Sequence, residues 1–281
     1  MWFVCGMCRC INLAPMQNVK PKKSLGQHFL VDLDIARRIA STLDEWKGLP
    51  VLEVGPGMGV LTQFLIAAGH DVTVAEIDTE SVAYLKANMA ELPHDRILEC
   101  DFLRTDLSEL YPDGQKFCVI GNYPYNISSQ IFFHLLDYKE QVACCSGMLQ
   151  REVAERLAAA PGTKARGILS VLLQAWYDVE YLFTVSEHVF NPPPKVKSGV
   201  IRMVRNDVQA LGCDERLFKT VVKTTFGQRR KTIRNSLKPL LPAGVPMPDH
   251  PLLGMRPEQL SVAQFVELTN LLSSLREPQQ L

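Results

Sequence analysis

At residues 51–62 the chain reads VLEVGPGMGVLT, an apolar run that passes into a glycine-rich turn. Glycine lets the backbone approach a ligand and turn sharply, so this stretch predicts a strand, a cofactor-binding turn and then a helix. A dinucleotide fingerprint needs a third glycine three residues after the second, and Val60 stands there instead. The match to a nicotinamide site therefore fails at one of its three glycines.

Two acidic residues follow at the ends of the next predicted strands. Glu76 closes the apolar run 72–78, where the tip of a second strand commonly holds ribose hydroxyls. Asp101 closes the run 96–102 and could accept a hydrogen bond from an adenine amino group. A surface acid at a strand end is the alternative for both, and it explains Asp101 equally well.

A fourth apolar run, residues 117–120, ends in the turn GNYPYN at 121–126. A proline-locked turn at the end of a parallel strand places Asn122 and Tyr125 where open α/β sheets bind ligands. The amino group of adenine is a poor nucleophile because its lone pair is delocalised. The Asn122 oxygen and the carbonyl beside Pro124 could accept its hydrogens, while Tyr125 stacks on the base. Taken alone, the segment is better explained as a tight turn that caps a helix.

The segment FNPPPKVKS, residues 190–198, predicts an extended, stiff loop. Such a loop could hold Phe190 outward, so that its ring covers the second face of an adenine whose first face lies on Tyr125. The alternative is a proline-rich connector with Phe190 in the core, and the local sequence slightly favours it.

The remaining periodicities alternate between strands and helices. Helices are expected over residues 32–43, 79–89, 128–136, 151–159 and 168–176, with further strands over 142–149, 179–185 and 199–204. This alternation predicts an α/β fold with a doubly wound, mostly parallel sheet and a late antiparallel hairpin at its edge. Helices over 217–238 and 257–274 predict a small C-terminal helical domain. We therefore divide the chain into an extension, 1–15, a sheet domain, 16–207, and a helical domain, 208–281.

Charge is balanced overall, with 30 basic and 30 acidic residues, but it is unevenly distributed. Residues 216–247 hold eight Lys or Arg and no acid, and a second basic arm precedes residue 30. Such clusters favour contacts with nucleic-acid phosphates, although a solvated helix face and a solvated tail are the alternatives. The expected RNA contacts are Lys20, Lys22, Lys23, Lys195, Lys223, Arg229, Arg230, Lys231 and Arg234.

Cysteine usage indicates reduced thiols and no metal site. Cys5 and Cys8 have metal-like spacing, but no second pair follows at a usable distance. Residues 1–15 lack the basic start of a signal peptide, and we expect translation to begin at Met16. No apolar run reaches the 18 residues needed to span a bilayer. Five cysteines lie inside apolar runs, as is typical of core thiols: Cys100, Cys118, Cys144, Cys145 and Cys213.

In this order and spacing, the motifs resemble the family of ribosomal small-subunit RNA adenine dimethyltransferases, the KsgA family. The resemblance runs from about Lys20 to Leu272. His28 and Tyr123 depart from the Asn and Leu that are common in the family, and we expect both to be tolerated. The markers are SLGQHFL at 24–30, EVGPGMG at 53–59, Asp101, GNYPYN at 121–126 and FNPPPKV at 190–196.

The resemblance implies a Rossmann-like enzyme that uses S-adenosylmethionine to methylate two adjacent adenines in the 3′-terminal hairpin of small-subunit (16S) rRNA. Each adenine would receive two methyl groups on its amino nitrogen, in a partly assembled subunit in the cytoplasm, and the family is linked to kasugamycin sensitivity. A monomer without membrane contact is expected. The implied catalytic residues are Asn122, Pro124, Tyr125 and Phe190, and the implied cofactor contacts are His28, Leu30, Gly55, Gly57, Glu76, Asp101 and Asn122.

Three other functions stay open at this point. Resistance methyltransferases of large-subunit rRNA share the turn at Asn122, although the loop 192–194 favours the small-subunit family. A DNA adenine methyltransferase fits less well, since its turn usually has two prolines before the aromatic residue. The protein could also act chiefly as a ribosome-assembly factor, with methylation as its release step.

Overall fold

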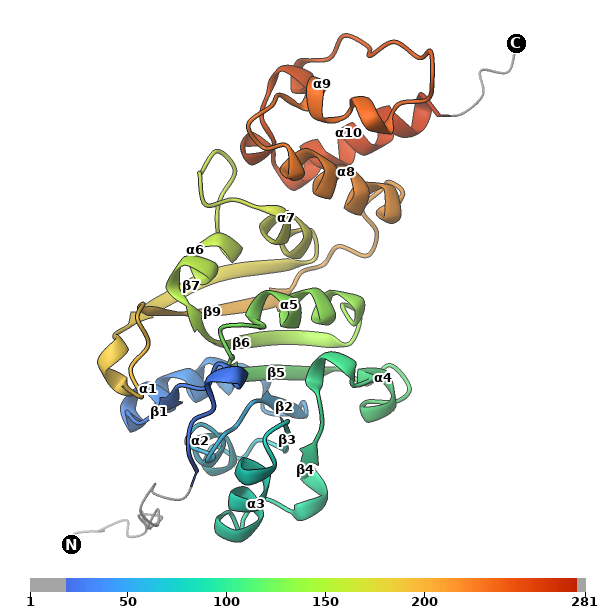
Figure 1. Ribbon diagram of the computed structural model, residues 1–281. Helices are drawn as coiled ribbons and strands as arrows, with labels where there is room; N and C mark the ends of the chain where they lie inside the picture. Colours follow the sequence, from blue (N-terminus) through green and yellow to red (C-terminus); the bar gives the residue numbers. More distant parts are fainter. Residues whose placement is uncertain (1–18, 277–281) are drawn as a thin grey trace, which may run out of the picture.

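A seven-stranded sheet forms the larger part of the protein, in a computed structural model that describes residues 19–276 (Figure 1). The expectations for residues 1–15, Cys5 and Cys8 lie outside this part. The strand order is β4-β3-β2-β5-β6-β9-β7, with β9 antiparallel to both neighbours and the other pairs parallel. The predicted mostly parallel sheet with an antiparallel edge is confirmed. Its strands are β2 (Val51–Val54), β3 (Val72–Glu76), β4 (Ile97–Glu99), β5 (Phe117–Asn122), β6 (Val142–Gln150), β7 (Tyr177–Val185) and β9 (Ser198–Arg205).

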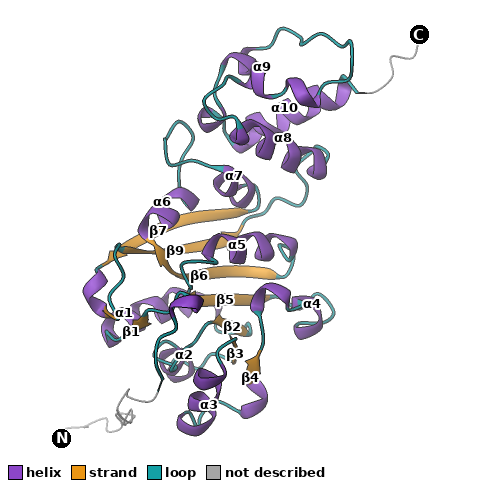
Figure 2. Cartoon of the chain, in the orientation of Figure 1, coloured by secondary structure: helices purple, strands orange, loops and turns teal. Residues whose placement is uncertain are grey.

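The central strands β2, β3 and β5 are buried at nearly every position because both faces of the sheet are covered. Successive side chains of a strand point to opposite faces. On β5, Val119 packs in one core cluster, whereas Cys118 and Ile120 pack in the other. Helices lie along the sheet in Figure 2: α1 (Leu33–Ala40), α2 (Thr62–Ala67), α3 (Thr79–Asn88), α4 (Leu107–Leu110), α5 (Ser128–Asp137), α6 (Arg151–Leu157) and α7 (Ile168–Gln174).

The C-terminal part is helical, as predicted, but one helix boundary is wrong. The expected helix over 217–238 is two helices, α8 (Glu215–Gly227) and α9 (Ile233–Ser236). Gly227 favours a break because glycine is a poor helix former. The chain then turns so that Ile233 is buried and its N–H donates to the carbonyl of Met255 at 2.8 Å. The last helix, α10 (Val262–Ser274), packs against α8.

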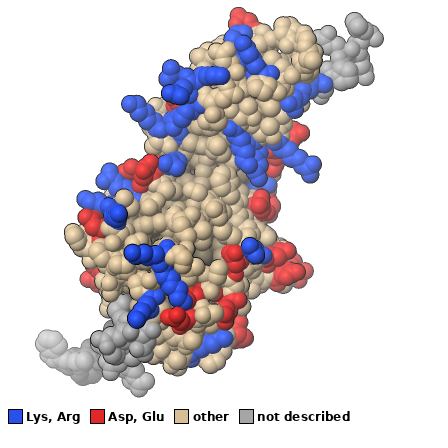
Figure 3. All heavy atoms as spheres, viewed as in Figure 1, with Lys and Arg blue, Asp and Glu red and all other residues tan. Residues whose placement is uncertain are grey.

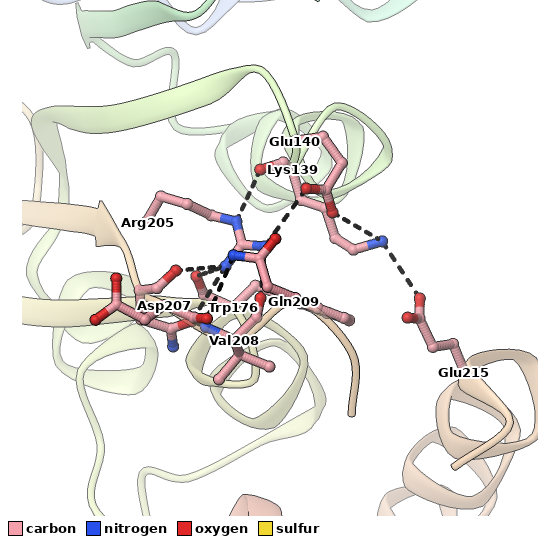
Figure 4. A network of polar contacts seen from close by, with 9 residues as sticks. Lys139, Glu140, Trp176, Arg205, Asp207, Val208, Gln209 and Glu215 are labelled. Atoms are coloured by element: carbon pink, nitrogen blue, oxygen red, sulfur yellow. Dashed lines mark hydrogen bonds and ion pairs between the residues drawn. The ribbon is translucent and has the colours of Figure 1, made fainter. Parts of the chain in front are cut away.

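A polar network ties the sheet to the helical part (Figure 4). Arg205, at the end of β9, donates from Nε to the carbonyl of Lys139 at 3.0 Å and from Nη1 to that of Trp176 at 3.2 Å. It also pairs with Glu140 at 3.6 Å. Lys139 in turn pairs with Glu215, at the start of α8, at 3.3 Å. The linker 206–214, between β9 and α8, is therefore held at both of its ends.

The five cysteines predicted as reduced core residues are all free thiols, but Cys100 and Cys213 are only partly buried, so the core prediction holds for the other three. Cys118, Cys144 and Cys145 are fully buried on neighbouring strands of the sheet. Within residues 19–276, no helix has the length and apolar character needed to cross a bilayer. The same residues contain no group of three His, Cys, Asp or Glu side chains arranged to hold a metal ion.

Candidate active site

A pocket opens at the carboxyl ends of β2, β3 and β5, where the strand order changes direction. β2 is paired with β3 on one side and with β5 on the other, so segments far apart in the sequence meet at this edge. Ligands of open α/β sheets bind at such a point. The pocket brings together eight of the predicted residues: His28, Leu30, Gly55, Gly57, Glu76, Asn122, Pro124 and Tyr125.

The floor of the pocket is the glycine-rich turn after β2. Gly57 has φ +56°, a left-handed conformation that favours glycine. A Cβ atom at this position would also lie 3.0 Å from the ring of Phe29, which belongs to the short strand β1 (Phe29–Leu30). The turn therefore closes against the N-terminal arm only because residue 57 has no side chain.

Glu76 fixes this turn from the end of β3. Its Oε2 accepts from the backbone N–H of Gly57 at 3.0 Å, and its Oε1 accepts from that of Asp78 at 2.9 Å. The side chain is buried, and burial raises its pKa. Each carboxylate oxygen has a second lone pair, so the group can still accept from a pair of ribose hydroxyls.

The side chain of Asn122 has a defined orientation. Its Nδ2 donates to the backbone carbonyl of His28 at 3.0 Å. A carbonyl oxygen can only accept, so the amide nitrogen must face it, and Oδ1 is left as an acceptor without a partner in residues 19–276. The ring of Tyr125 lies beside the His28 ring with centroids 5.3 Å apart, and its hydroxyl bonds Ser198 Oγ. His28 Nδ1 donates to the carbonyl of Pro192 at 2.9 Å.

Tyr123, one of the two departures from the pattern of the resembled family, is accommodated in the core. The side chain is 1% exposed, and its hydroxyl donates to the carbonyl of Ser146 at 2.7 Å. A Cβ atom at Gly121 would lie 3.0 Å from this ring, and one at Gly147 would lie 2.6 Å from it. Two glycines on neighbouring strands thus make room for the larger residue.

Glu53 is a pocket residue that the sequence reasoning missed. It lines the pocket, is 1% exposed, and its Oε2 has no hydrogen-bond partner in the described part of the chain. Burial, reinforced by the charge of Glu76, raises its pKa to about 8. Its neighbours Leu52 and Val54 are buried apolar residues, so a charged residue inside an apolar strand was the available signal. Oε2 is therefore an available acceptor for a cationic ligand group, and the approach of that charge would favour the ionised carboxylate.

Replacing Glu53 with Gln should change how stability depends on pH. A carboxyl whose pKa is raised in the folded state binds its proton more tightly there than in the unfolded chain. Its stabilising contribution is complete below the ordinary value of 4.5 and is lost as the pH rises toward about 8. The slope for one such group is about 1.4 kcal/mol per pH unit. Urea unfolding between pH 5 and 8 should show a shallower decline for Glu53→Gln than for the unchanged protein, and equal slopes would contradict this assignment.

Phe190 does not face outward, so the expectation of an exposed ring is wrong and the alternative, a core residue, which the local sequence slightly favours, is confirmed. The residue is 4% exposed and packs in a core cluster with Leu30 and Met148. It belongs to β8 (Phe190–Asn191), which pairs antiparallel with β1 and sets Phe190 opposite Leu30. The prolines extend the loop, but this strand pairing decides which way the ring points.

Asp101 also lies away from the pocket lining. Its Oδ1 accepts from the backbone N–H of Leu103 at 3.0 Å, and its other oxygen lies 3.4 Å from Arg104. The carboxylate caps a short turn after β4, which is the role that the surface-acid alternative describes.

The nine predicted RNA contacts fall into two groups, those that form an ion pair within the protein and those that do not. The ammonium of Lys22 pairs with Asp78 and Glu80, so this lysine is not a free phosphate contact. Arg234 lies 3.4 Å from Asp249. Figure 3 shows Lys and Arg gathered over the helical part, with acids over α4. Seven predicted contacts have no carboxylate within 4 Å in residues 19–276 and are exposed: Lys20, Lys23, Lys195, Lys223, Arg229, Arg230 and Lys231.

Comparison with known proteins identifies close relatives over nearly the whole chain. The family model described as "Ribosomal RNA adenine dimethylase" matches residues 18–274. A ribosomal RNA small subunit methyltransferase A of Parabacteroides distasonis is 72% identical, over 90% of this chain and 94% of the relative. The protein of the same name from Porphyromonas gingivalis is 66% identical, over 92% of this chain and 99% of the relative.

Two solved structures have a similar fold. A dimethyladenosine transferase of Plasmodium falciparum has a TM-score of 0.70 at 22% identity, and the match covers 88% of this chain and 98% of that one. The 23S rRNA methyltransferase ErmE has a TM-score of 0.64 at 27% identity, and the match covers 85% of this chain and 99% of that one.

Proposed function

The chain belongs to the ribosomal RNA adenine dimethylase family, and from that premise we propose that it methylates two adjacent adenines in the 3′-terminal hairpin of small-subunit rRNA. It is an S-adenosylmethionine-dependent rRNA adenine dimethyltransferase. We further propose that its substrate is a late assembly intermediate of the subunit, that it acts in the cytoplasm, and that it works as a monomer. The observation that supports the proposed chemistry best is the free Oδ1 of Asn122 at the mouth of a pocket built on the glycine turn.

The pocket residues fit the cofactor. Glu53 offers to a cationic group its buried Oε2, which has no hydrogen-bond partner in residues 19–276, and Glu76 offers two acceptors to a ribose. Asp101 stands just beyond the end of β4, and its carboxylate keeps further lone pairs for an adenine amino group while it caps its turn. We propose that the cofactor is held by His28, Leu30, Gly55, Gly57, Glu76, Asp101 and Asn122, and we add Glu53 to this set.

The cofactor supplies an activated methyl group, so the protein's task is to align and polarise the adenine. Oδ1 of Asn122 and the carbonyl beside Pro124 would accept the two amino hydrogens and raise the electron density on nitrogen. Tyr125 would stack on the base, and a hydrogen bond to Ser198 steadies its ring. Phe190 could hold the other face only after β8 separates from β1. No strong base is needed, because the methylated ammonium loses its proton readily.

We propose that the helical domain, 208–281, and the basic arm hold the rRNA while the sheet domain, 16–207, carries out the transfer. The support is the set of seven exposed basic residues that have no carboxylate within 4 Å in residues 19–276, a set that leaves out the paired Lys22 and Arg234. Phosphate contacts of this kind position an RNA without reading its sequence. Since Lys22 is paired within the protein, we propose that it anchors the arm over the pocket instead of binding RNA.

Transfer of labelled methyl groups to ribosomal subunits tests the proposal. Small subunits from a strain without these modifications should accept several methyl groups each, and mature small subunits should accept none. The likeness to ErmE, a 23S rRNA methyltransferase, makes large subunits the necessary comparison. Label on large subunits would overturn the small-subunit assignment. Tight binding of immature small subunits without any transfer would favour a role as an assembly factor.

A further inference from the structure

A second cavity lies between the sheet part and the helical part. Figure 1 shows the loop between α6 and α7 reaching toward the end of α8. The cavity between these elements is lined by Arg156, Lys164, Arg166, Phe226 and Arg229, among others. It is separate from the pocket at the carboxyl ends of the strands, since the two share no lining residue.

Arg166 is the unusual residue of this interdomain cavity. The side chain is 1% exposed, and its Nη2 has no hydrogen-bond partner in the described part of the chain. Its Nη1 donates to the carbonyl of Ala159 and to Oε1 of Gln174, both at 2.7 Å, and its Nε donates to the carbonyl of Leu260 at 3.1 Å. All three acceptors are neutral. Burial without a counter-ion lowers its pKa to about 10, and such a charge is costly unless an anion approaches.

Two further cations stand at the rim of the interdomain cavity. Lys164 and Arg229 are exposed, and neither has a carboxylate within 4 Å in residues 19–276. Arg229 also donates from Nη2 to the carbonyl of Lys164 at 2.9 Å, which joins the turn after α8 to the α6–α7 loop.

The acids that line the cavity do not offset this charge. Glu152 pairs with Arg156 at 3.1 Å, and Glu155 pairs with Arg151 at 2.7 Å. Both carboxylates are therefore matched by arginines of their own helix. Lys164, Arg166 and Arg229 remain as a net positive charge around the cavity.

We propose that the interdomain cavity is a phosphate-binding subsite for the backbone of the substrate rRNA. Lys164 and Arg229 contact the phosphate at the rim, and Arg166 supplies a fixed positive charge beneath them. The inference rests on the proposed function, which supplies an RNA as the ligand. Because the subsite contains residues of both parts of the chain, a phosphate bound there would hold the helical domain and the sheet domain in one arrangement.

The salt dependence of binding to unmethylated small subunits tests the subsite. Each phosphate contact adds about 0.9 to the slope of log affinity against log salt, so one lost contact makes the fall between 50 and 200 mM KCl about threefold smaller. Lys164→Gln and Arg166→Met should each show this change. Lys86→Gln, an exposed lysine on α3 without an ion pair in residues 19–276, is the matched control and should not. Lys164 is at the surface, so its variant remains informative if Arg166→Met fails to fold.

Inorganic phosphate separates an RNA subsite from a site for a free anion. Phosphate should raise the melting temperature of the unchanged protein more than chloride of equal ionic strength does, and Lys164→Gln should lose this difference. A normal salt slope in both variants would overturn the RNA assignment, whether or not phosphate stabilises the protein. Methyl transfer by the unchanged protein is measured on the same subunits. Failure of that transfer would count against the proposed function, whereas normal transfer with unaltered slopes would count against the subsite alone.

Discussion

Replacing Asn122 with alanine should lower the rate of methyl transfer about 100- to 1,000-fold, while the affinity for S-adenosylmethionine changes little. Removing one oriented hydrogen-bonding group that acts on developing charge typically has this cost. The structure gives the reason, since the amide nitrogen is held by the carbonyl of His28 and Oδ1 is the acceptor left for the adenine. Single-turnover transfer to unmethylated small subunits and cofactor binding by calorimetry measure the two quantities separately.

Asn122→Asp is the matched variant for this prediction. It keeps an acceptor oxygen but removes the amide that donates to His28, and it sets a negative oxygen against that carbonyl. We expect the rate to fall for this variant as well, because the side chain is no longer held. If Asn122→Ala weakened cofactor binding as much as it slowed transfer, Asn122 would act by positioning the arm and not by polarising the adenine.

Replacing Glu76 with Gln should weaken S-adenosylmethionine binding about 10- to 100-fold. Both carboxylate oxygens accept backbone N–H groups, from Gly57 and from Asp78. A Gln side chain has only one acceptor oxygen, so it cannot accept from both backbone N–H groups and from a pair of ribose hydroxyls, and the bound cofactor loses a hydrogen bond. Such a loss costs about 1–3 kcal/mol, and a tenfold change in affinity corresponds to about 1.4 kcal/mol.

Glu99→Gln is the control for this second prediction. Glu99 is exposed at the end of the neighbouring strand β4 and does not line the pocket. Its variant should bind the cofactor normally, and Glu76→Gln should recover much of its transfer rate at high cofactor concentration. An unchanged dissociation constant for Glu76→Gln would remove this residue from the cofactor site.

The strands and turns of the sheet were predictable because their signals are local. An apolar run followed by glycines, as at residues 51–59, indicates a buried strand and a tight turn without knowledge of the rest of the chain. Asp32 and Asp78 likewise accept from the first backbone N–H groups of α1 and α3, which begin close to the predicted positions. Helix periodicity was less informative near Gly227, where burial of Ile233 interrupts a pattern that reads as one helix.

The candidate site was partly predictable for the same reason. Asn122 and Glu76 stand at the ends of strands, and a parallel sheet brings such ends to one edge. The surroundings of Phe190, Lys22 and Glu53 were not predictable from the local sequence. The direction of Phe190 follows from its pairing with Leu30, and the pairing of Lys22 follows from the approach of Asp78. Whether Oε2 of Glu53 has a hydrogen-bond partner depends on which side chains the fold brings next to it, and in residues 19–276 it has none.

By itself, the sequence determined the succession of strands and helices along the chain, the glycine turn, the turn at Asn122 and the resemblance to a family. Each of these depends on short runs of neighbouring residues. Only the tertiary structure decided which side chains are free to act. Charge and hydrogen-bond capacity belong to a residue, but whether they are already satisfied depends on partners far away in the chain. Arg166 illustrates this, because its guanidinium is surrounded by three neutral acceptors, one of them the carbonyl of Leu260 from a distant segment, and no carboxylate lies within 4 Å of it in residues 19–276.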